Sequence, residues 1–458
     1  MAKSRLVELP LEILGIICTQ CLLPSHLPKQ QLFLEAKENR DGARDLCNFS
    51  QTCRRMHKIV RPMIAPYFGT RLGDLDFNYI SYVCRVVQNR DLASRETLLD
   101  ICFDHFIGDI TPETRMILHS AARDVGVERL WFPWVSDQPL VINPILDEDL
   151  DGNQRLLGNL ADYAYYKSGR GGINWSEYET MHAFLRSVLL EIALLHLPNI
   201  AQLSLPLDLE FRELQPESLP SVKALALRDY RELFPQTSDT SNSLNGASNL
   251  INAACNLQGL YVEGIRTARK ELFMFNLEWL IITKSIMDAA TLGHILRSCR
   301  NLRSLTYEPA AQVNIDAAAE IGLSHEHPSL LVQAMEPAFA TLETLRLRIP
   351  EWDQHGDADG GGLGLVTGQD LHSFERLKTL ELSAAAVALD HLIIDGPVLV
   401  DLIPPGLESF TLTGAGPEWL RAVGDLVSET KLGLFPNLRV LDIPGHVDKI
   451  WFGPGQAA

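Results

Sequence analysis

The sequence predicts an α/β solenoid, in which a curved parallel sheet carries outer helices, preceded by a small all-α segment. Three observations support this prediction. At 458 residues the chain is too long for one compact core, so several domains or an elongated array are expected. A short strand pattern recurs nine times after residue 196. Stretches with helical spacing separate these strands.

The recurring strand has an apolar residue, two variable residues and then Leu-x-apolar. The nine matches are "LPNIAQLSL" (197–205), "LPSVKALAL" (219–227), "NLQGLYV" (256–262), "NLEWLII" (276–282), "NLRSLTY" (301–307), "TLETLRL" (341–347), "RLKTLEL" (376–382), "GLESFTL" (406–412) and "NLRVLDI" (437–443). This is the strand signature of leucine-rich repeats. Alternate strand residues point to opposite faces, so the two late apolar positions enter one core while the residue between them faces outward.

Helical spacing is clearest in "MHAFLRSVLLEIALLH" (181–196) and "DAATLGHILRSC" (288–299). Strand, loop, helix and strand in this order imply parallel pairing and a right-handed coil. Central apolar positions lie 20 to 40 residues apart, wider than the roughly 20–29 of regular leucine-rich repeats, and long loops absorb the difference. We therefore expect an irregular leucine-rich-repeat solenoid over 99–452 and a flexible tail over 453–458.

The array is expected to begin with weaker strands, "LLDICF" (98–103) and "VERLWF" (127–132), on either side of a helical segment (111–126). At the other end, "HVDKIWF" (446–452) is expected to cap the exposed core. Residues 69–98 are expected to form a helical connection into the array.

Residues 1–68 contain two short amphipathic segments. "LPLEIL" (9–14) places Pro10 at a helix start and Glu12 in the first turn, and an apolar face follows. "DLCNFSQTCRRMHKIVRPMIAPYF" (45–68) carries a second apolar face. Such short helices cannot bury these faces alone, so a partner or the next domain must cover them.

These two segments resemble the F-box, which opens with Leu-Pro-x-Glu-Ile/Leu and continues to a Leu-rich helix ending in Cys/Ser-Lys/Arg. "LCNFSQTCRRMHKIV" (46–60) matches the second half. The order of the parts resembles fungal-type F-box proteins with divergent leucine-rich repeats, although the spacer over 24–44 is longer than usual.

The resemblance implies a non-catalytic substrate receptor of a ubiquitin ligase. Its F-box would dock a Skp-type adaptor, which joins a cullin and a RING protein, and its repeats would hold a protein substrate. The residues expected to contact the adaptor are Leu9, Pro10, Ile13, Leu14 and Ile17. The alternative is a leucine-rich-repeat scaffold outside any ligase, whose N-terminal helices only cap the solenoid.

The outward strand positions are candidates for holding the substrate, because concave solenoid surfaces often bind partners. They mix Arg with carboxylates and hydroxyls, which suits charge-paired recognition of a protein or peptide. The full set is Ser204, Ala226, Arg228, Tyr261, Glu263, Ile281, Thr283, Thr306, Glu308, Arg346, Arg348, Glu381, Ser383, Thr411, Thr413 and Asp442. From it we select Tyr261, Glu263, Glu308, Arg346, Arg348 and Glu381 as substrate-binding candidates. A site on the surface loops is the alternative.

Composition excludes several classes of protein. The net charge of −18 disfavours nucleic acid, because phosphate contacts need clustered Lys and Arg. No apolar stretch is long enough to span a membrane, and the longest, "FLRSVLLEIALLHL" (184–197), is interrupted by Arg186 and Glu191. Glu8, Pro10 and Glu12 break the apolar run that a signal peptide needs. Eight scattered cysteines fit a reducing compartment, so a cytoplasmic or nuclear location is expected.

No segment predicts a catalytic, metal or cofactor site. "CTQC" (18–21) with Cys47, Cys53 and His57 could form a zinc site, but only one tight ligand pair is present. "DEDLDG" (147–152) resembles half of an EF-hand loop but lacks the bidentate Glu at position twelve. The Gly-rich segment 357–368 has no Lys for a phosphate cradle, and "SHEH" (324–327) lacks a third ligand.

Overall fold

The computed structural model describes residues 56, 60, 79–101, 111–127, 175–229, 243–310, 328–349, 366, 368–387, 399–444 and 447–452. These residues form an α/β fold whose eleven strands follow the order of the chain. The chain divides into two compact units. The first comprises residues up to 241 together with 246–255, and the second comprises 242–245 together with 256–458.

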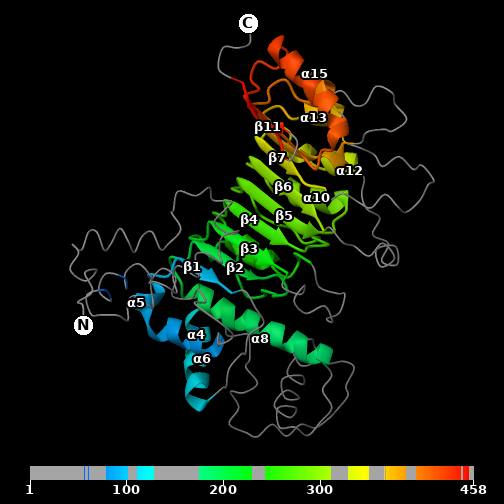
Figure 1. Cartoon of the computed structure of the whole chain (residues 1–458). Coiled ribbons are helices and arrows are strands. Elements are labelled where there is room, and N and C mark those ends of the chain that lie inside the picture. Colours follow the sequence, from blue (N-terminus) through cyan, green and yellow to red (C-terminus); the bar gives the residue numbers. More distant parts are fainter. Residues whose placement is uncertain are drawn as a thin grey trace, which may run out of the picture. The chain divides into compact units, whose positions relative to one another are not determined.

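The first unit combines three short parallel strands with helices (Figure 1). Its strands β1, β2 and β3 pair in that order, and α4 packs against both α6 and α8. In chain order the elements are α4 (Tyr79–Gln88), α5 (Arg90–Ala93), β1 (Leu98–Asp100), α6 (Pro112–Asp124), α8 (Trp175–Leu195), β2 (Gln202–Pro206), β3 (Ala224–Arg228) and α9 (Ser248–Ala253).

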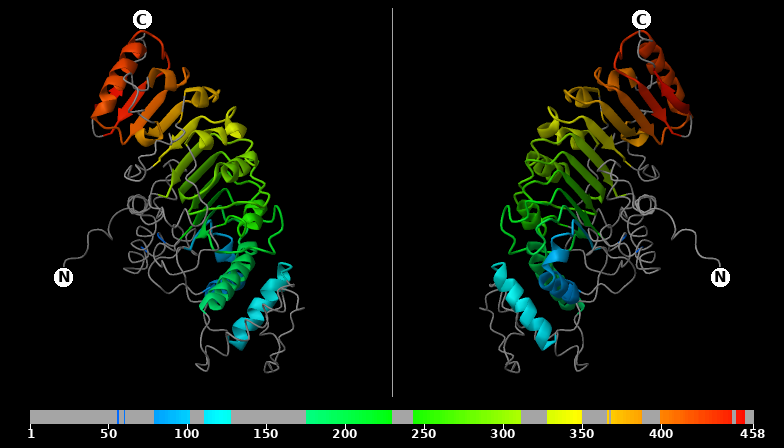
Figure 2. Two further views of the ribbon diagram at one scale, coloured as in Figure 1. Left: turned by 90° about the vertical axis from the view of Figure 1, so that its right-hand side faces the viewer. Right: turned by 90° about the vertical axis from the view of Figure 1, so that its left-hand side faces the viewer.

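The second unit is an open sheet of strands joined by short helical segments. The side views show its strands stacked one after another in chain order (Figure 2). Its strands are β4 (Gly259–Glu263), β5 (Trp279–Ser285), β6 (Ser304–Pro309), β7 (Thr344–Leu347), β8 (Thr379–Ser383), β9 (Ser409–Thr413), β10 (Val440–Ile443) and β11 (Val447–Trp451). All pairs are parallel except the last, β10 with β11.

Helical segments connect these strands, and four of them follow one another along one side of the sheet in Figure 1: α10, α12, α13 and α15. The α-helices are α10 (Ala289–Arg297), α12 (Pro328–Gln333), α13 (Gly368–His372), α14 (Leu399–Leu402) and α15 (Leu420–Lys431). The single 3-10 turns are η5 (Glu336–Ala338), η6 (Ala384–Ala386) and η7 (Pro417–Trp419). Most of these helices are shorter than the average helix of a globular protein, so their stability depends on packing against the sheet.

All nine strands predicted from the recurring pattern are present, as β2 to β10. Their central apolar residues lie in register with one another. In the first unit Leu203 pairs with Leu225. In the second unit the row is Leu260, Leu280, Leu305, Leu345, Leu380, Phe410 and Leu441. Each side chain in both rows is at most 1% exposed, so each contributes about 1.5–3 kcal/mol of burial free energy.

The same hydrogen-bond pair recurs at the start of most strands. Two successive backbone N–H groups donate to one carbonyl that lies just before the preceding strand. Glu278 and Trp279 donate to the carbonyl of Gln258 at 2.8 and 3.1 Å, and Lys223 and Ala224 donate to that of Ala201 at 2.8 and 3.1 Å. Further carbonyls that accept such a pair belong to Glu278, Arg303, Glu343, Lys378 and Glu408. This repeated geometry fixes the step from one strand to the next.

The weaker elements predicted at the two ends of the array are partly confirmed. "LLDICF" provides β1, and the helical segment after it provides α6, which begins with Thr111 accepting from the N–H of Thr114 at 3.2 Å. "VERLWF" lies almost wholly outside the described residues. "HVDKIWF" supplies β11, which turns back antiparallel to β10. No helix of the described part of the chain is long and apolar enough to cross a membrane.

Gly259, the first residue of β4, has no room for a side chain. Its register partner is Trp279 on β5, and a Cβ on Gly259 would overlap the indole ring of Trp279. The indole therefore lies directly over the backbone of the neighbouring strand, and Trp279 is buried there. A glycine in a strand interior commonly marks such a close approach.

Replacing Gly259 with Ala is expected to lower the free energy of unfolding by about 1–3 kcal/mol, because the new methyl group forces the indole out of its position. Urea unfolding followed by tryptophan fluorescence measures this change. Gly424→Ala is the matched control, since no atom lies within 4 Å of its Cβ position in the middle of α15. That change is expected to raise the unfolding free energy by about 0.5–1 kcal/mol. Equal effects at the two positions would contradict the placement of Trp279.

Candidate functional site

The candidate site lies on the face of the second unit's sheet that is opposite the leucine row. We call this the polar face and define it by the strand positions that alternate with the buried leucines. Its central row is Tyr261, Ile281, Thr306, Arg346, Glu381, Thr411 and Asp442, each paired with the next across neighbouring strands. A second row two residues further along contains Glu263, Thr283, Glu308, Ser383 and Thr413.

Facing away from the leucines does not make every one of these residues accessible. Tyr261, Ile281 and Thr306 are only 5–6% exposed, although they lie on the polar face. In the first unit, Ser204 and Ala226 occupy the equivalent positions and are also buried. These outward positions therefore do not all form one open surface, because strand alternation determines the direction of a side chain but not what packs over the face. We call the region around Glu308, Arg346 and Arg348 the accessible part of the polar face, because these side chains are 35–46% exposed.

Four of the six substrate-binding candidates form one ion-paired group on this accessible part. The Glu381 carboxylate forms two ion pairs. Its Oε2 lies 3.3 Å from Arg346 Nε, and its Oε1 lies 2.7 Å from Arg348 Nε. Arg348 also lies 3.8 Å from Glu308 through its Nη1. We call these four residues the arginine–glutamate group. The hydrogen bond to Glu381 raises the pKa of the Arg348 guanidinium, which keeps this side chain charged.

Strand register brings this group together. Arg346 lies on β7 directly opposite Glu381 on β8. Arg348 follows β7 and extends the ladder, since its backbone N–H donates to the carbonyl of Tyr307 at 3.0 Å. Both arginines alternate with the buried Leu345 and Leu347, so they share one face. Exposed ion pairs stabilise a fold weakly, and such a group is better suited to orienting side chains than to holding the sheet together.

The other two candidates, Tyr261 and Glu263, belong to a separate group at the β4 end. The Tyr261 hydroxyl donates to Glu263 Oε2 at 3.3 Å and lies 3.0 Å from Thr283 Oγ1. Lys284 Nζ pairs with Glu263 Oε1 at 2.9 Å. Because Tyr261 is nearly buried and its hydroxyl is engaged within the chain, this group offers little to a partner.

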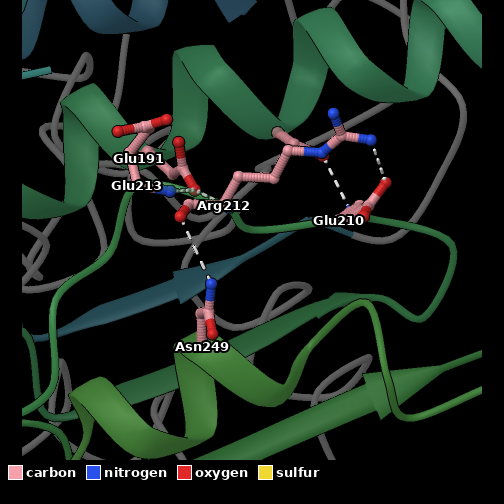
Figure 3. Close-up of polar contacts among 6 residues, drawn as sticks. Glu191, Glu210, Arg212, Glu213 and Asn249 are labelled. Atoms are coloured by element: carbon pink, nitrogen blue, oxygen red, sulfur yellow. Dashed lines mark hydrogen bonds and ion pairs between the residues drawn. The ribbon is translucent and has the colours of Figure 1, made fainter. Parts of the chain in front are cut away.

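A buried polar group that we did not predict as a site lies in the first unit, between α8 and the segment after β2 (Figure 3). Glu191 on α8 accepts the backbone N–H groups of Arg212 at 2.5 Å and Glu213 at 3.0 Å. The Arg212 side chain forms an ion pair with Glu210 at 2.7 Å. The backbone carbonyl of Arg212 accepts a hydrogen bond from Asn249 Nδ2 at 3.3 Å. One carboxylate thus anchors two consecutive residues of an irregular segment to a helix.

Two neighbours on α8 contribute to the same contact. Arg186 pairs with Asp208 at 2.8 Å, and the Ser187 hydroxyl accepts the backbone N–H of Glu210 at 2.9 Å. Arg186 and Glu191 are the charged residues that interrupt the apolar stretch of this helix. That interruption was the only sign in the sequence that these two residues have polar partners. It did not reveal the partners themselves, which lie more than twenty residues away along the chain. Their role is structural, because Arg186 forms an ion pair with Asp208 and Glu191 accepts two backbone N–H groups of the same unit.

Burial raises the pKa of the Glu191 carboxyl from its ordinary 4.5 to about 7. The N–H groups of Glu213 and Arg212 oppose this shift, whereas the Glu213 carboxylate adds to it. The folded chain therefore binds a proton at Glu191 more tightly than the unfolded chain does. The stability associated with this proton is fully present below pH 4.5 and is lost as the pH rises through about 7.

The sequence-derived candidates of the N-terminal region fall outside the described residues. These include all five adaptor-binding candidates, Leu9, Pro10, Ile13, Leu14 and Ile17, and the proposed zinc ligands around "CTQC". From the second half of the same N-terminal region, only Met56 and Val60 are described, and both are buried. Within the described ranges, no three His, Cys, Asp or Glu side chains are grouped so that they could hold a metal ion.

No protein family model matches this sequence, and no curated protein matches it. The function is therefore inferred from the residues themselves and from the geometry of the two units.

Glu191→Gln should make stability less dependent on pH, because the amide keeps an acceptor for the two N–H groups but cannot ionise. Between pH 5 and pH 8, the wild-type chain is expected to lose about 2–3 kcal/mol more unfolding free energy than the variant. Urea unfolding at the two pH values measures this difference. Glu210→Gln, at an exposed carboxylate nearby, should retain the wild-type pH dependence. Parallel pH profiles for wild type and Glu191→Gln would contradict this assignment.

Proposed function

We propose that this chain is the substrate-receptor subunit of a Skp–cullin–F-box ubiquitin ligase. The observation that carries the proposal is the order of its parts: "LPLEIL" (9–14) and "LCNFSQTCRRMHKIV" (46–60) precede nine strands of one repeating pattern. The first segments supply an apolar surface for an adaptor, and the strands supply a polar face for a substrate. No chemical step is assigned to the chain itself.

We propose further that the strands belong to an irregular leucine-rich-repeat solenoid. Three features support this finer description. The strands follow chain order within each unit, and all neighbouring pairs except β10 with β11 are parallel. Their central apolar residues pair in register, and the same two-amide hydrogen bond starts most strands. Variable helical segments of four to twelve residues connect the strands of the second unit, as expected where repeat length is irregular.

Adaptor binding is assigned to Leu9, Pro10, Ile13, Leu14 and Ile17. A fully buried aliphatic side chain contributes about 1.5–3 kcal/mol, so a few such residues suffice for a stable interface. Substrate binding is assigned to the accessible part of the polar face, where the arginine–glutamate group lies. Separate adaptor and substrate surfaces let the chain bring a target to the ligase.

A second candidate function is a repeat scaffold without a ligase, in which the N-terminal helices only cover the core. One observation agrees with it: Met56 and Val60 are buried. A segment devoted to covering its own core would show such burial. The same burial also suits an F-box, whose helices need an internal core of their own beside the adaptor surface. The two candidates therefore differ in whether Ile13 and Leu14 bind an outside subunit.

Co-expression with a Skp-type adaptor tests the proposal. The full chain is expected to co-elute with the adaptor in size-exclusion chromatography, and Ile13→Asp with Leu14→Asp should abolish co-elution, because buried charge at an apolar interface is costly. Leu432→Asp is the matched control, since Leu432 is an exposed leucine of the second unit. It should leave co-elution unchanged.

Circular dichroism of each variant separates loss of binding from loss of folding. If the unmodified chain does not associate with the adaptor, the ligase role is rejected and the scaffold is preferred. Co-elution that survives both aspartates in a folded variant would reject the assigned residues.

A further inference from the structure

Arg346 and Arg348 on the polar face have N–H donors that no described residue of the chain engages. A guanidinium carries five N–H donors in a rigid plane. Arg346 and Arg348 each direct Nε to Glu381, and Arg348 has one further, longer contact to Glu308. Within the described ranges, no contact is recorded for the Nη groups of Arg346. Both side chains remain accessible, at 35% and 46% exposed.

Glu381 orients both guanidinium groups without exhausting them. Its carboxylate is 14% exposed; Oε1 accepts a hydrogen bond from Arg348 Nε, and Oε2 forms an ion pair with Arg346 Nε. A shared acceptor between two strands limits the rotation of both side chains, so less conformational entropy is lost when a third group binds them. The remaining N–H groups belong to side chains that are 35% and 46% exposed. They form a preoriented set of donors.

The arginine–glutamate group carries two positive and two negative charges, so it is neutral overall, and any attraction for an anion depends on the arginine N–H donors that its own glutamates leave unengaged. Arg346 and Arg348 carry two positive charges, and Glu381 cancels one of them. Glu308, which is 40% exposed and 3.8 Å from Arg348, adds a negative charge at the edge. The neighbours of the group in the central row, Thr306 and Thr411, are neutral. Glu308 repels any anion placed here, and it repels a phosphate, with up to two negative charges, more strongly than a single carboxylate.

We propose that Arg346 and Arg348 form a clamp that binds the carboxylate of an Asp or Glu side chain on a protein partner, with Glu381 as the positioning residue. Arginine N–H groups bind carboxylates in paired hydrogen bonds that are stronger than neutral ones. The proposal rests on the proposed function in one respect, namely that this partner is the substrate. The group that the polar face recognises is then an acidic side chain of the substrate.

The test uses the full chain and random twelve-residue peptides displayed on phage. Peptides are selected on wild type, on an R346Q/R348Q variant and on K378Q. Glutamine can still donate to Glu381, so the variant should keep its fold, which circular dichroism checks. Lys378 is the matched control, because it is an exposed cation of the same sheet that pairs with Glu343 at 3.1 Å away from the clamp.

Peptides selected on wild type and on K378Q are expected to share an Asp or Glu at one position, and those selected on R346Q/R348Q should lack it. The acidic residue is then replaced in a synthetic, fluorescein-labelled peptide. Its exchange for Gln should weaken binding to wild type on the order of tenfold and to R346Q/R348Q less than about twofold. Fluorescence anisotropy gives both ratios.

Three results would overturn the clamp: no peptides selected on wild type, no acidic preference among them, or equal loss in wild type and R346Q/R348Q. A phosphoserine peptide that binds more tightly than the Glu peptide would overturn the choice of a carboxylate. Adaptor co-elution is measured on the same R346Q/R348Q protein and should be unchanged. If acidic peptides bind but the adaptor does not, the ligase role fails and the clamp stands.

Discussion

The register of parallel strands is the constraint on which the rest of this structure depends. A slip of one residue would move every leucine of a strand from the core to the opposite face. Leu345 opposite Leu380 therefore fixes Arg346 opposite Glu381, one position further along each strand. The apolar row holds the sheet together, and the arrangement of charges on the other face follows from it. The polar face needs little stability of its own, since burial on the leucine side supplies it.

The strands were predictable because their signal is local. Alternation over six or seven residues identifies a strand, and the repeated Leu-x-apolar ending marks which side is buried. The pairing of Arg346 with Glu381 could also have been predicted, since both occupy the same position of successive repeats. Alternation could not reveal which residues of the polar face are buried under other parts of the chain. Tyr261, Ile281 and Thr306 have the predicted direction but are buried, because packing over a face depends on chain segments far away in sequence.

Glu191 illustrates a second limit of the sequence. A charged residue inside an apolar helix indicates a special environment, but its partners here are backbone N–H groups, which every residue except proline possesses. Nothing distinguishes Arg212 and Glu213 from other positions before the fold brings them together. The result is a helix that serves two purposes at once: its leucines fill the core, and its polar side chains hold an irregular segment that has no regular hydrogen bonding of its own.

The reversal of β11 has a consequence for growth of the sheet. Each strand from β4 to β9 pairs along one edge with a following strand that runs in the same direction. β11 occupies that edge of β10 in the opposite sense, so a further unit of the same design would meet the wrong spacing of donors and acceptors. Among the described strands, β11 thus ends the run of parallel pairing, and a further strand could join this end of the sheet only along the outer edge of β11.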